Sequence, residues 1–113
     1  MAFFNSLLTV WDALKQSVGD TFVRRHDVPS IFAGHYDPSF TLDLCYKDLD
    51  LLAGLGQDFA TDLPMTRAAH QRFREARNEY GGDAAELHVC KLLEEQAGIS
   101  LRVSGDWPIH SEA

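Results

Sequence analysis

The chain has 113 residues, of which 45% are hydrophobic and 24% charged, a composition typical of one globular domain and not of a disordered protein. Ten lysines and arginines against 17 aspartates and glutamates give a formal net charge of −7, so we expect no nucleic-acid partner. No apolar run approaches the roughly 20 residues that span a bilayer, and the first residues lack the pattern of a secretory signal. We therefore predict no membrane association and a cytoplasmic location, where the thiols of Cys45 and Cys90 stay reduced.

The apolar residues recur at the three- and four-residue spacing of helices, and no stretch alternates as a strand does. A first helix is predicted over residues 5–18, where one apolar stripe ends just before Gly19. Residues 21–30 are mixed in character and predict a short helix or a turn.

A second long helix is predicted to begin near Asp37 and Pro38, or a few residues later, and to run through residues 38–61. It carries two apolar stripes, so we expect neighbours to cover it on two sides. Gly54 and Gly56 each weaken a helix by about 1 kcal/mol relative to alanine, which predicts the close approach of another backbone. The stripes are Leu42, Cys45, Leu49, Leu52, Gly56 and Phe59 on one side, and Leu44, Leu51 and Leu55 on the other.

A third helix is predicted over residues 64–80 and a fourth over residues 84–97, followed by a tail over residues 99–113. Asp83 and Glu86 have the spacing of a capping box at the start of the fourth helix. In the tail, Leu101, Val103 and Trp107 are candidates to fold back onto the helices. The predicted fold class is all-α: a four-to-five-helix bundle in a single domain spanning residues 1–113.

Residue patterns alone indicate little chemistry. There is no glycine-rich phosphate loop and no nucleophile motif, and His88 and Cys90 fall on opposite sides of a helix, so we predict no metal site. The five histidines are interpreted as surface or partly buried imidazoles: His26, His35, His70, His88 and His110. A basic stripe on the third helix, which could meet a phosphate or a partner's carboxylates, is interpreted as a solvated face paired with Glu75 and Glu79: Arg67, His70, Arg74 and Arg77.

Lys47 lies on the polar side of the second predicted helix, in line with Asp43, Asp50 and Gly54. One interpretation is an exposed lysine that pairs with Asp43 one turn earlier. The other is an ammonium group directed into a cleft, where it meets an anion or a carbonyl group.

Residues 34–51 read G-H-Y-D-P-S-F-T-L-D-L-C-Y-K-D-L-D-L. This block resembles the pattern G-x-Y-x-x-x-F-x-x-x-L-x-x-K-D-L-x-L of the β-hydroxyacid dehydrogenases, the family that includes 3-hydroxyisobutyrate dehydrogenase and 2-hydroxy-3-oxopropionate reductase. Three shorter segments resemble further family motifs in the family's order, at residues 19–22, 62–66 and 80–83. The resemblance covers about residues 7–98.

The resemblance implies the all-helical C-terminal domain of a 6-phosphogluconate dehydrogenase-like enzyme, which in the family follows a Rossmann domain that binds NAD or NADP. It implies that Lys47 reaches the cofactor near its nicotinamide end and that Phe40 packs near the same cleft. The family's catalytic-lysine motif, substrate loop and Rossmann glycines have no counterpart in these 113 residues. We therefore expect no catalysis and no cofactor binding by the isolated chain, which needs a Rossmann-domain partner.

Two functional hypotheses follow, and a third, an independent enzyme with a site of its own, requires a pocket of convergent polar groups. The first is a C-terminal dimerisation and cofactor-cleft-completing domain of an NAD(P)-dependent oxidoreductase, as a fragment, a split subunit or a gene remnant. The second is a stand-alone helical interaction module that has lost the dehydrogenase chemistry. Without the family's long inter-domain helix we expect an uncovered apolar face, and hence a homodimer. The residues expected on that face are Leu42, Leu49, Leu52 and Phe59.

Overall fold

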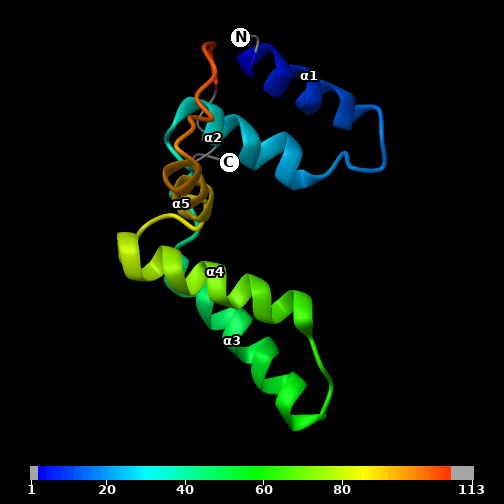
Figure 1. The fold of residues 1–113 in the computed structure, drawn as a ribbon, viewed down its shortest axis with the longest axis vertical. Helices are drawn as coiled ribbons and strands as arrows, with labels where there is room; N and C mark the ends of the chain where they lie inside the picture. Colours follow the sequence, from blue (N-terminus) through cyan, green and yellow to red (C-terminus); the bar gives the residue numbers. More distant parts are fainter. Residues whose placement is uncertain (1–2, 108–113) are drawn as a thin grey trace. The chain divides into compact units, whose positions relative to one another are not determined.

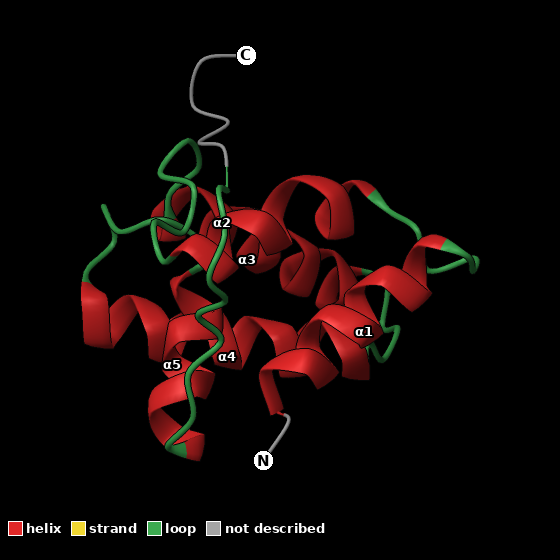
Figure 2. Cartoon of the chain, turned by 90° about the horizontal axis from the view of Figure 1, so that it is seen from above, coloured by secondary structure: helices red, strands yellow, loops and turns green. Residues whose placement is uncertain are grey.

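The computed structural model describes residues 3–107, with side chains from residue 7 onward, and within this range the chain is helical (Figures 1 and 2). An isolated bridge between Thr41 and Ala85 is its only β-pairing in the described range, which contains no strand and confirms the all-α class. His110 and the end of the predicted tail lie outside the described residues. None of the described helices combines the length and apolar character needed to cross a membrane. The elements in order are α1 (Phe3–Lys15), the π-helix η1 (Val23–Asp27), α2 (Val28–Ala33), α3 (Leu42–Asp58), α4 (Pro64–Tyr80) and α5 (His88–Ala97).

The chain forms two compact units, which are described separately. The terminal unit consists of Met1–Asp37 and Glu94–Ala113, and the central unit is Pro38–Leu93.

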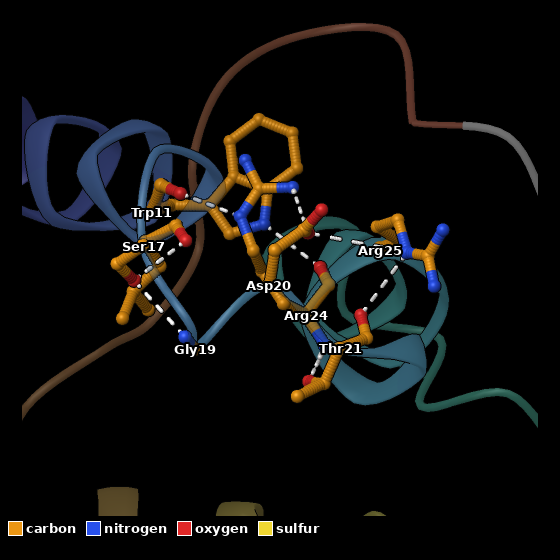
Figure 3. Close-up of polar contacts among 8 residues, drawn as sticks. Trp11, Ser17, Gly19, Asp20, Thr21, Arg24 and Arg25 are labelled. Atoms are coloured by element: carbon orange, nitrogen blue, oxygen red, sulfur yellow. Dashed lines mark hydrogen bonds and ion pairs between the residues drawn. The ribbon is translucent and has the colours of Figure 1, made fainter.

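In the terminal unit, a reciprocal pair of hydrogen bonds ties α1 to η1 (Figure 3). The Trp11 indole N–H donates to the Arg24 carbonyl at 2.9 Å, and the Arg24 Nε–H donates to the Trp11 carbonyl at 2.7 Å. The Arg24 guanidinium lies over the Trp11 ring, 4.5 Å from its centroid, and Asp20 pairs with it at 3.5 Å. These contacts satisfy the donors of a buried arginine, which would otherwise be costly to remove from water.

The loop after α1 begins earlier than residue 18. The Ser17 hydroxyl donates to the Leu14 carbonyl at 2.8 Å and accepts the Gly19 N–H at 3.0 Å (Figure 3). Because a serine side chain competes in this way for backbone groups, the helix ends at Lys15 and a turn replaces its last predicted residues.

Two further groups of contacts hold the segment after α5 within the terminal unit. Trp107 packs edge-on against Trp11 and Phe32, with ring centroids 5.7 and 5.4 Å away, and the Val103 N–H donates to the Phe32 carbonyl at 3.1 Å. The buried Glu94 carboxylate accepts from the Tyr36 hydroxyl at 3.0 Å, from the Leu101 N–H at 3.3 Å and from the Arg102 guanidinium at 2.6 Å. The segment 99–107 thus packs against α1 and α2.

The central unit is built on the α3–α4 hairpin, whose two helices lie side by side (Figure 1). Its core centres on the fully buried Leu42 and Ala76, together with Leu92 of α5. The side chains packed against this core are Phe73 and Tyr80 of α4, Ala84 of the segment between α4 and α5, and Val89 of α5. Helix α4 has the predicted bounds because Pro64 opens it and Gly81, at φ 87°, follows its last residue.

Helix α3 begins at Leu42, four residues after Pro38. Thr41 is its N-cap and accepts the Leu44 N–H at 3.3 Å. At the other end Ala60, at φ 49°, closes the helix before residue 61.

The capping box predicted from Asp83 and Glu86 is wrong. The Glu86 N–H donates to the Phe40 carbonyl at 2.8 Å, and the Leu42 N–H donates to the Ala84 carbonyl at 2.8 Å. Residues 84–87 are therefore paired with the segment before α3, and α5 begins only at His88.

The expectation that α3 is covered on two sides is also wrong. The second stripe is exposed over Leu51 and Leu55. In the first stripe Leu42 is buried, contrary to the uncovered face predicted around it, whereas Leu52 and Phe59 are exposed. Of the two helical glycines, Gly56 is closely approached: a Cβ there would lie 3.0 Å from the Thr61 carbonyl. A Cβ at Gly54 would meet nothing within 4 Å, so no backbone packs on that residue.

We predict that Leu42→Ala lowers the free energy of unfolding by about 2–5 kcal/mol, because it empties a fully buried site. Leu44→Ala, two residues along the same helix, is the matched control and lowers it by about 1 kcal/mol or less, because that side chain is 43% exposed. Urea unfolding followed by circular dichroism measures both values. Equal losses for the two variants contradict the assignment of Leu42 as the core anchor.

Candidate functional site

The polar face of α3 carries the cationic residue singled out by the sequence. Lys47 is one turn beyond Asp43 and one turn before Asp50, and its side chain is 60% exposed. Its Nζ lies 3.3 Å from an Asp48 carboxylate oxygen, and Asp48 is similarly exposed. The expected pair with Asp43 does not form, because Asp43 hydrogen-bonds to Arg77 of α4. Lys47 is thus held only by a solvent-screened contact, which leaves its ammonium able to turn to another anion or carbonyl group.

Phe40 lies in the bend before α3, not on the helical face of Lys47. Its ring is half-buried, and its carbonyl takes part in the backbone pairing with Glu86. The structure thus places Phe40 at the base of α3 and Lys47 in the second turn of that helix.

An aromatic and charged cluster joins the middle of α3 to α4. Tyr46 stacks on the His70 imidazole with ring centroids 4.8 Å apart, and the Arg77 guanidinium lies 4.9 Å from the Tyr46 centroid. The Asp43 carboxylate, through its hydrogen bond and its charge, raises the pKa of the Arg77 guanidinium above its ordinary value. His70 is buried, and its Nε2 lies 3.4 Å from Asp50 without the alignment of a hydrogen bond.

A groove of about 730 Å³ follows this cluster along the α3–α4 hairpin of the central unit. Three members of the basic stripe on α4 line it: Arg67, His70 and Arg74. The fourth member, Arg77, pairs with Asp43 instead. The predicted pairing of the stripe with Glu75 and Glu79 is wrong for Arg67, which pairs with Asp62 at 2.7 Å.

The floor of the groove includes Gly54, on the same face of α3 as Lys47 and Asp50. A Cβ at this position would meet no atom of another element within 4 Å, so the glycine is not needed for packing. The groove presents both signs of charge, with Asp50 and Asp62 among its lining residues beside the arginines.

Cys45 is part of the central unit but is not a nucleophile. Burial, which is the largest cause, acts together with the charge and hydrogen bond of Glu86 and the charge of Asp48 to raise the pKa of its thiol to about 11. A group with this pKa is protonated at neutral pH, whereas nucleophilic attack and metal binding need the thiolate.

The metal ligands weighed from the sequence are not brought together. Within the described range, the His, Cys and carboxylate groups close enough to share an ion are His26, Asp27 and Asp37 of the terminal unit. Sequence reasoning missed this cluster because Asp37 is ten residues from Asp27 and reaches it only through a turn. The adjacent pair at residues 26–27 was its only local signal.

Two comparisons with known proteins bear on this arrangement. A family model described as the NAD-binding domain of NADP-dependent 3-hydroxyisobutyrate dehydrogenase matches residues 6–93. Over 84 residues the chain is 29% identical to L-threonate dehydrogenase of Cupriavidus necator. The matched region covers 74% of this chain and 28% of that protein, so the chain spans less than a third of this relative's length. The range matched by the family model, residues 6–93, includes all of α3, with Lys47, and all of α4.

We predict that Cys45 reacts slowly with iodoacetamide. With a pKa of about 11, about one thiol in 1,000 is ionised at pH 8, against about a quarter for a free cysteine, so alkylation is slower by a factor on the order of 100. Glu86→Gln removes a negative charge, lowers the thiol pKa and speeds the reaction, whereas Asp83→Asn, an exposed change, leaves the rate unaltered. Peptide mass spectrometry measures the rate against pH. Alkylation of Cys45 at the rate of glutathione contradicts this account.

Proposed function

The chain belongs to the 3-hydroxyisobutyrate dehydrogenase family, and from this premise we propose that it completes the cofactor cleft of an NAD(P)-dependent oxidoreductase and helps that enzyme to dimerise. The match over residues 6–93 confirms the resemblance read from residues 34–51. The helices described here are a domain of the C-terminal region of the β-hydroxyacid dehydrogenases. The reaction that we propose for the complete oxidoreductase is the oxidation of a β-hydroxyacid, or the reduction of the matching semialdehyde.

The observation that carries the proposal is the exposure of the Lys47 side chain. A long cationic side chain, 60% exposed, extends from a helix whose first residue is fixed by the core, and its partner Asp48 is itself exposed. Such a lysine packs its aliphatic stem on the helix and keeps its ammonium group in a polar environment. Lys47 is therefore suited to meet a polar group at the nicotinamide end of the cofactor or the carboxylate of the substrate.

The residues present fit NAD(P) as one edge of a site. Lys47 supplies a donor and Phe40, half-buried at the base of α3, supplies an apolar surface nearby in the sequence. The surrounding charge is negative, because Asp43, Asp48 and Asp50 share this part of the helix. An acidic surface does not hold a dinucleotide phosphate by itself, so the phosphates belong to a Rossmann domain, on the same polypeptide or on a partner subunit.

The cofactor and the residues of this chain then have different roles in the proposed reaction. The nicotinamide cofactor, when bound, supplies hydride transfer. Lys47 donates hydrogen bonds that orient the cofactor or the substrate, and the α3–α4 hairpin holds its backbone in place. No residue of this chain is assigned the proton transfer of the reaction.

Dimerisation is supported by exposed apolar side chains of the α3–α4 hairpin, which come from both apolar stripes of α3. Leu51, Leu52, Leu55 and Phe59 of α3 and the following loop are exposed, as is Met65 at the start of α4. Apolar side chains gathered in this way on a short hairpin mark a surface that another protein buries. We propose that a second copy of the chain covers it, because an interface between identical subunits pairs the same patch with itself.

The same apolar surface supports the second candidate function, a helical homodimeric interaction module without dehydrogenase chemistry. The two candidates share the dimer and differ in whether Lys47 meets a cofactor. A cofactor titration therefore separates them.

The sequence alone led us to expect no cofactor binding by the isolated chain. Because the ammonium of Lys47 is exposed, we predict instead that NADH or NADPH binds the chain weakly, at millimolar concentration, and perturbs the backbone amide resonances around Lys47. Two-dimensional nuclear magnetic resonance detects such weak binding in a chain of 12.7 kDa. Lys47→Ala removes the perturbation, whereas Lys15→Ala, which deletes an exposed lysine of α1, is the matched control and leaves it unchanged.

Perturbations that survive Lys47→Ala, or none at saturating cofactor, overturn the cofactor role and leave the interaction module as the function. Binding tighter than about 100 μM, a free energy of about −5.5 kcal/mol, contradicts the proposal that the phosphates depend on another domain.

We predict a homodimer at micromolar concentration. Sedimentation equilibrium should give twice the 12.7 kDa of one chain. Phe59→Asp places a charge on a side chain that is 75% exposed in the single chain, so it dissociates the dimer without unfolding the helices. Val10→Asp, a comparable change on an exposed residue of α1, is the control and keeps the dimer. A monomer in the unmodified chain rules out the dimer.

A further inference from the structure

Three side chains of the terminal unit place metal-binding atoms close together. The His26 Nδ1 lies 2.9 Å from Asp27 Oδ1 and 3.4 Å from Asp37 Oδ2, and the three atoms all lie within 4.8 Å of one another. An ion that binds at roughly 2.0–2.2 Å from each ligand needs ligands about 3–3.5 Å apart. The cluster therefore has nearly the dimensions of a three-ligand site, and small side-chain rotations complete it.

From this geometry we infer that His26, Asp27 and Asp37 bind a divalent transition-metal ion of the zinc type. This site is separate from Lys47 and goes beyond the proposed dehydrogenase function. Two carboxylate oxygens and one imidazole nitrogen are a donor set that zinc accepts, whereas Mg²⁺ and Ca²⁺ prefer oxygen ligands alone.

The carboxylates of the cluster are buried, and a buried carboxylate is stabilised by a cation beside it. The side chain of Asp37 is 5% exposed and that of Asp27 is 12% exposed. Two carboxylates this deeply placed are unfavourable unless positive charge lies beside them. A neutral imidazole bound through Nδ1 and a divalent ion balance the two carboxylates.

Contacts from outside the cluster orient the His26 ring and hold the backbone at Asp37. The His26 ring stacks on Phe22 with centroids 4.5 Å apart, which orients its Nδ1 edge. The Asp37 N–H donates to the His35 Nδ1 at 3.4 Å. The neighbouring Tyr36 is fixed by its hydrogen bond to Glu94.

The ion also has a route of entry and a structural consequence. His26 is 23% exposed, so one side of the cluster faces solvent, and water fills the remaining coordination positions. His26 and Asp27 are the last two residues of the π-helix η1. The third ligand, Asp37, lies in a turn where Tyr36 and Asp37 have φ values of 56° and 34°. A bound ion stabilises that unfavourable turn against η1, because binding to the folded state alone adds to stability.

The test uses the untagged chain after treatment with a chelator. We titrate Co²⁺ and follow its visible absorbance, then displace it with Zn²⁺ and measure the stoichiometry by calorimetry. We expect one equivalent to bind, with no competition from millimolar Mg²⁺. His26→Gln, Asp27→Asn and Asp37→Asn should each lower the affinity at least about 100-fold, and Asp12→Asn, an exposed control of the same charge change in α1, should leave it unaltered.

A second measurement on the unmodified chain keeps the test decisive if a variant fails to fold. The imidazole nitrogen resonances report which of the five histidines binds Zn²⁺ and through which nitrogen, and we expect Nδ1 of His26. Absence of binding overturns the proposal. Binding that persists in Asp27→Asn and Asp37→Asn, or that shifts another histidine in place of His26, overturns it as well.

Discussion

The buried start of α3 is the constraint on which the central unit depends. Leu42 is fully buried against Ala76 and Leu92, and its N–H donates to the Ala84 carbonyl at 2.8 Å while the neighbouring Asp43 N–H donates to the Gly82 carbonyl at 3.0 Å. The turn at residues 81–82 approaches α3 so closely that a Cβ at Gly82 would lie 2.2 Å from the Asp43 carboxylate. Packing and backbone bonds together fix where α3 begins. Helical periodicity then determines which face carries Lys47, Asp50 and Gly54.

The sequence predicts those features of the fold that depend on local signals. Helix α4 has a proline at one end and a glycine at the other, so its bounds follow from residues next to each other in the chain. The start of α5 does not follow from neighbouring residues, because the Ala84 carbonyl and the Glu86 N–H pair with Leu42 and Phe40. Asp83 and Glu86 have the spacing of a capping box, but the Glu86 N–H donates to the carbonyl of Phe40, which is distant in the sequence. Periodicity likewise finds both apolar stripes of α3 without indicating that Leu51 and Leu55 stay exposed.

In the candidate site, too, the sequence predicts what local signals mark and misses what contacts between separate elements create. Lys47 is found from the sequence because one helix and one short block contain everything that marks it. The groove needs the α3–α4 hairpin to bring Arg67 and Arg74 opposite Gly54. The cluster of His26, Asp27 and Asp37 depends on a turn in which Tyr36 and Asp37 have positive φ values. Glycine in a sequence indicates such a conformation more clearly than tyrosine or aspartate does. Contacts that join separate elements are therefore beyond the reach of spacing arguments.

The charges around Lys47 indicate what kind of contribution this domain makes. Its ammonium lies beside Asp48, between the helical positions of Asp43 and Asp50, so the field of the helix opposes the approach of a phosphate. A neutral carboxamide or carbonyl group is not repelled in this way and accepts a hydrogen bond from the ammonium. Of the two partners proposed for Lys47, the acidic surroundings therefore favour the neutral group of the cofactor, already held by another domain, over the substrate carboxylate. In that role the exact placement of α3 by Leu42 matters more than the affinity of the domain for the cofactor, because a hydrogen bond that orients a reacting group depends on the position of its donor.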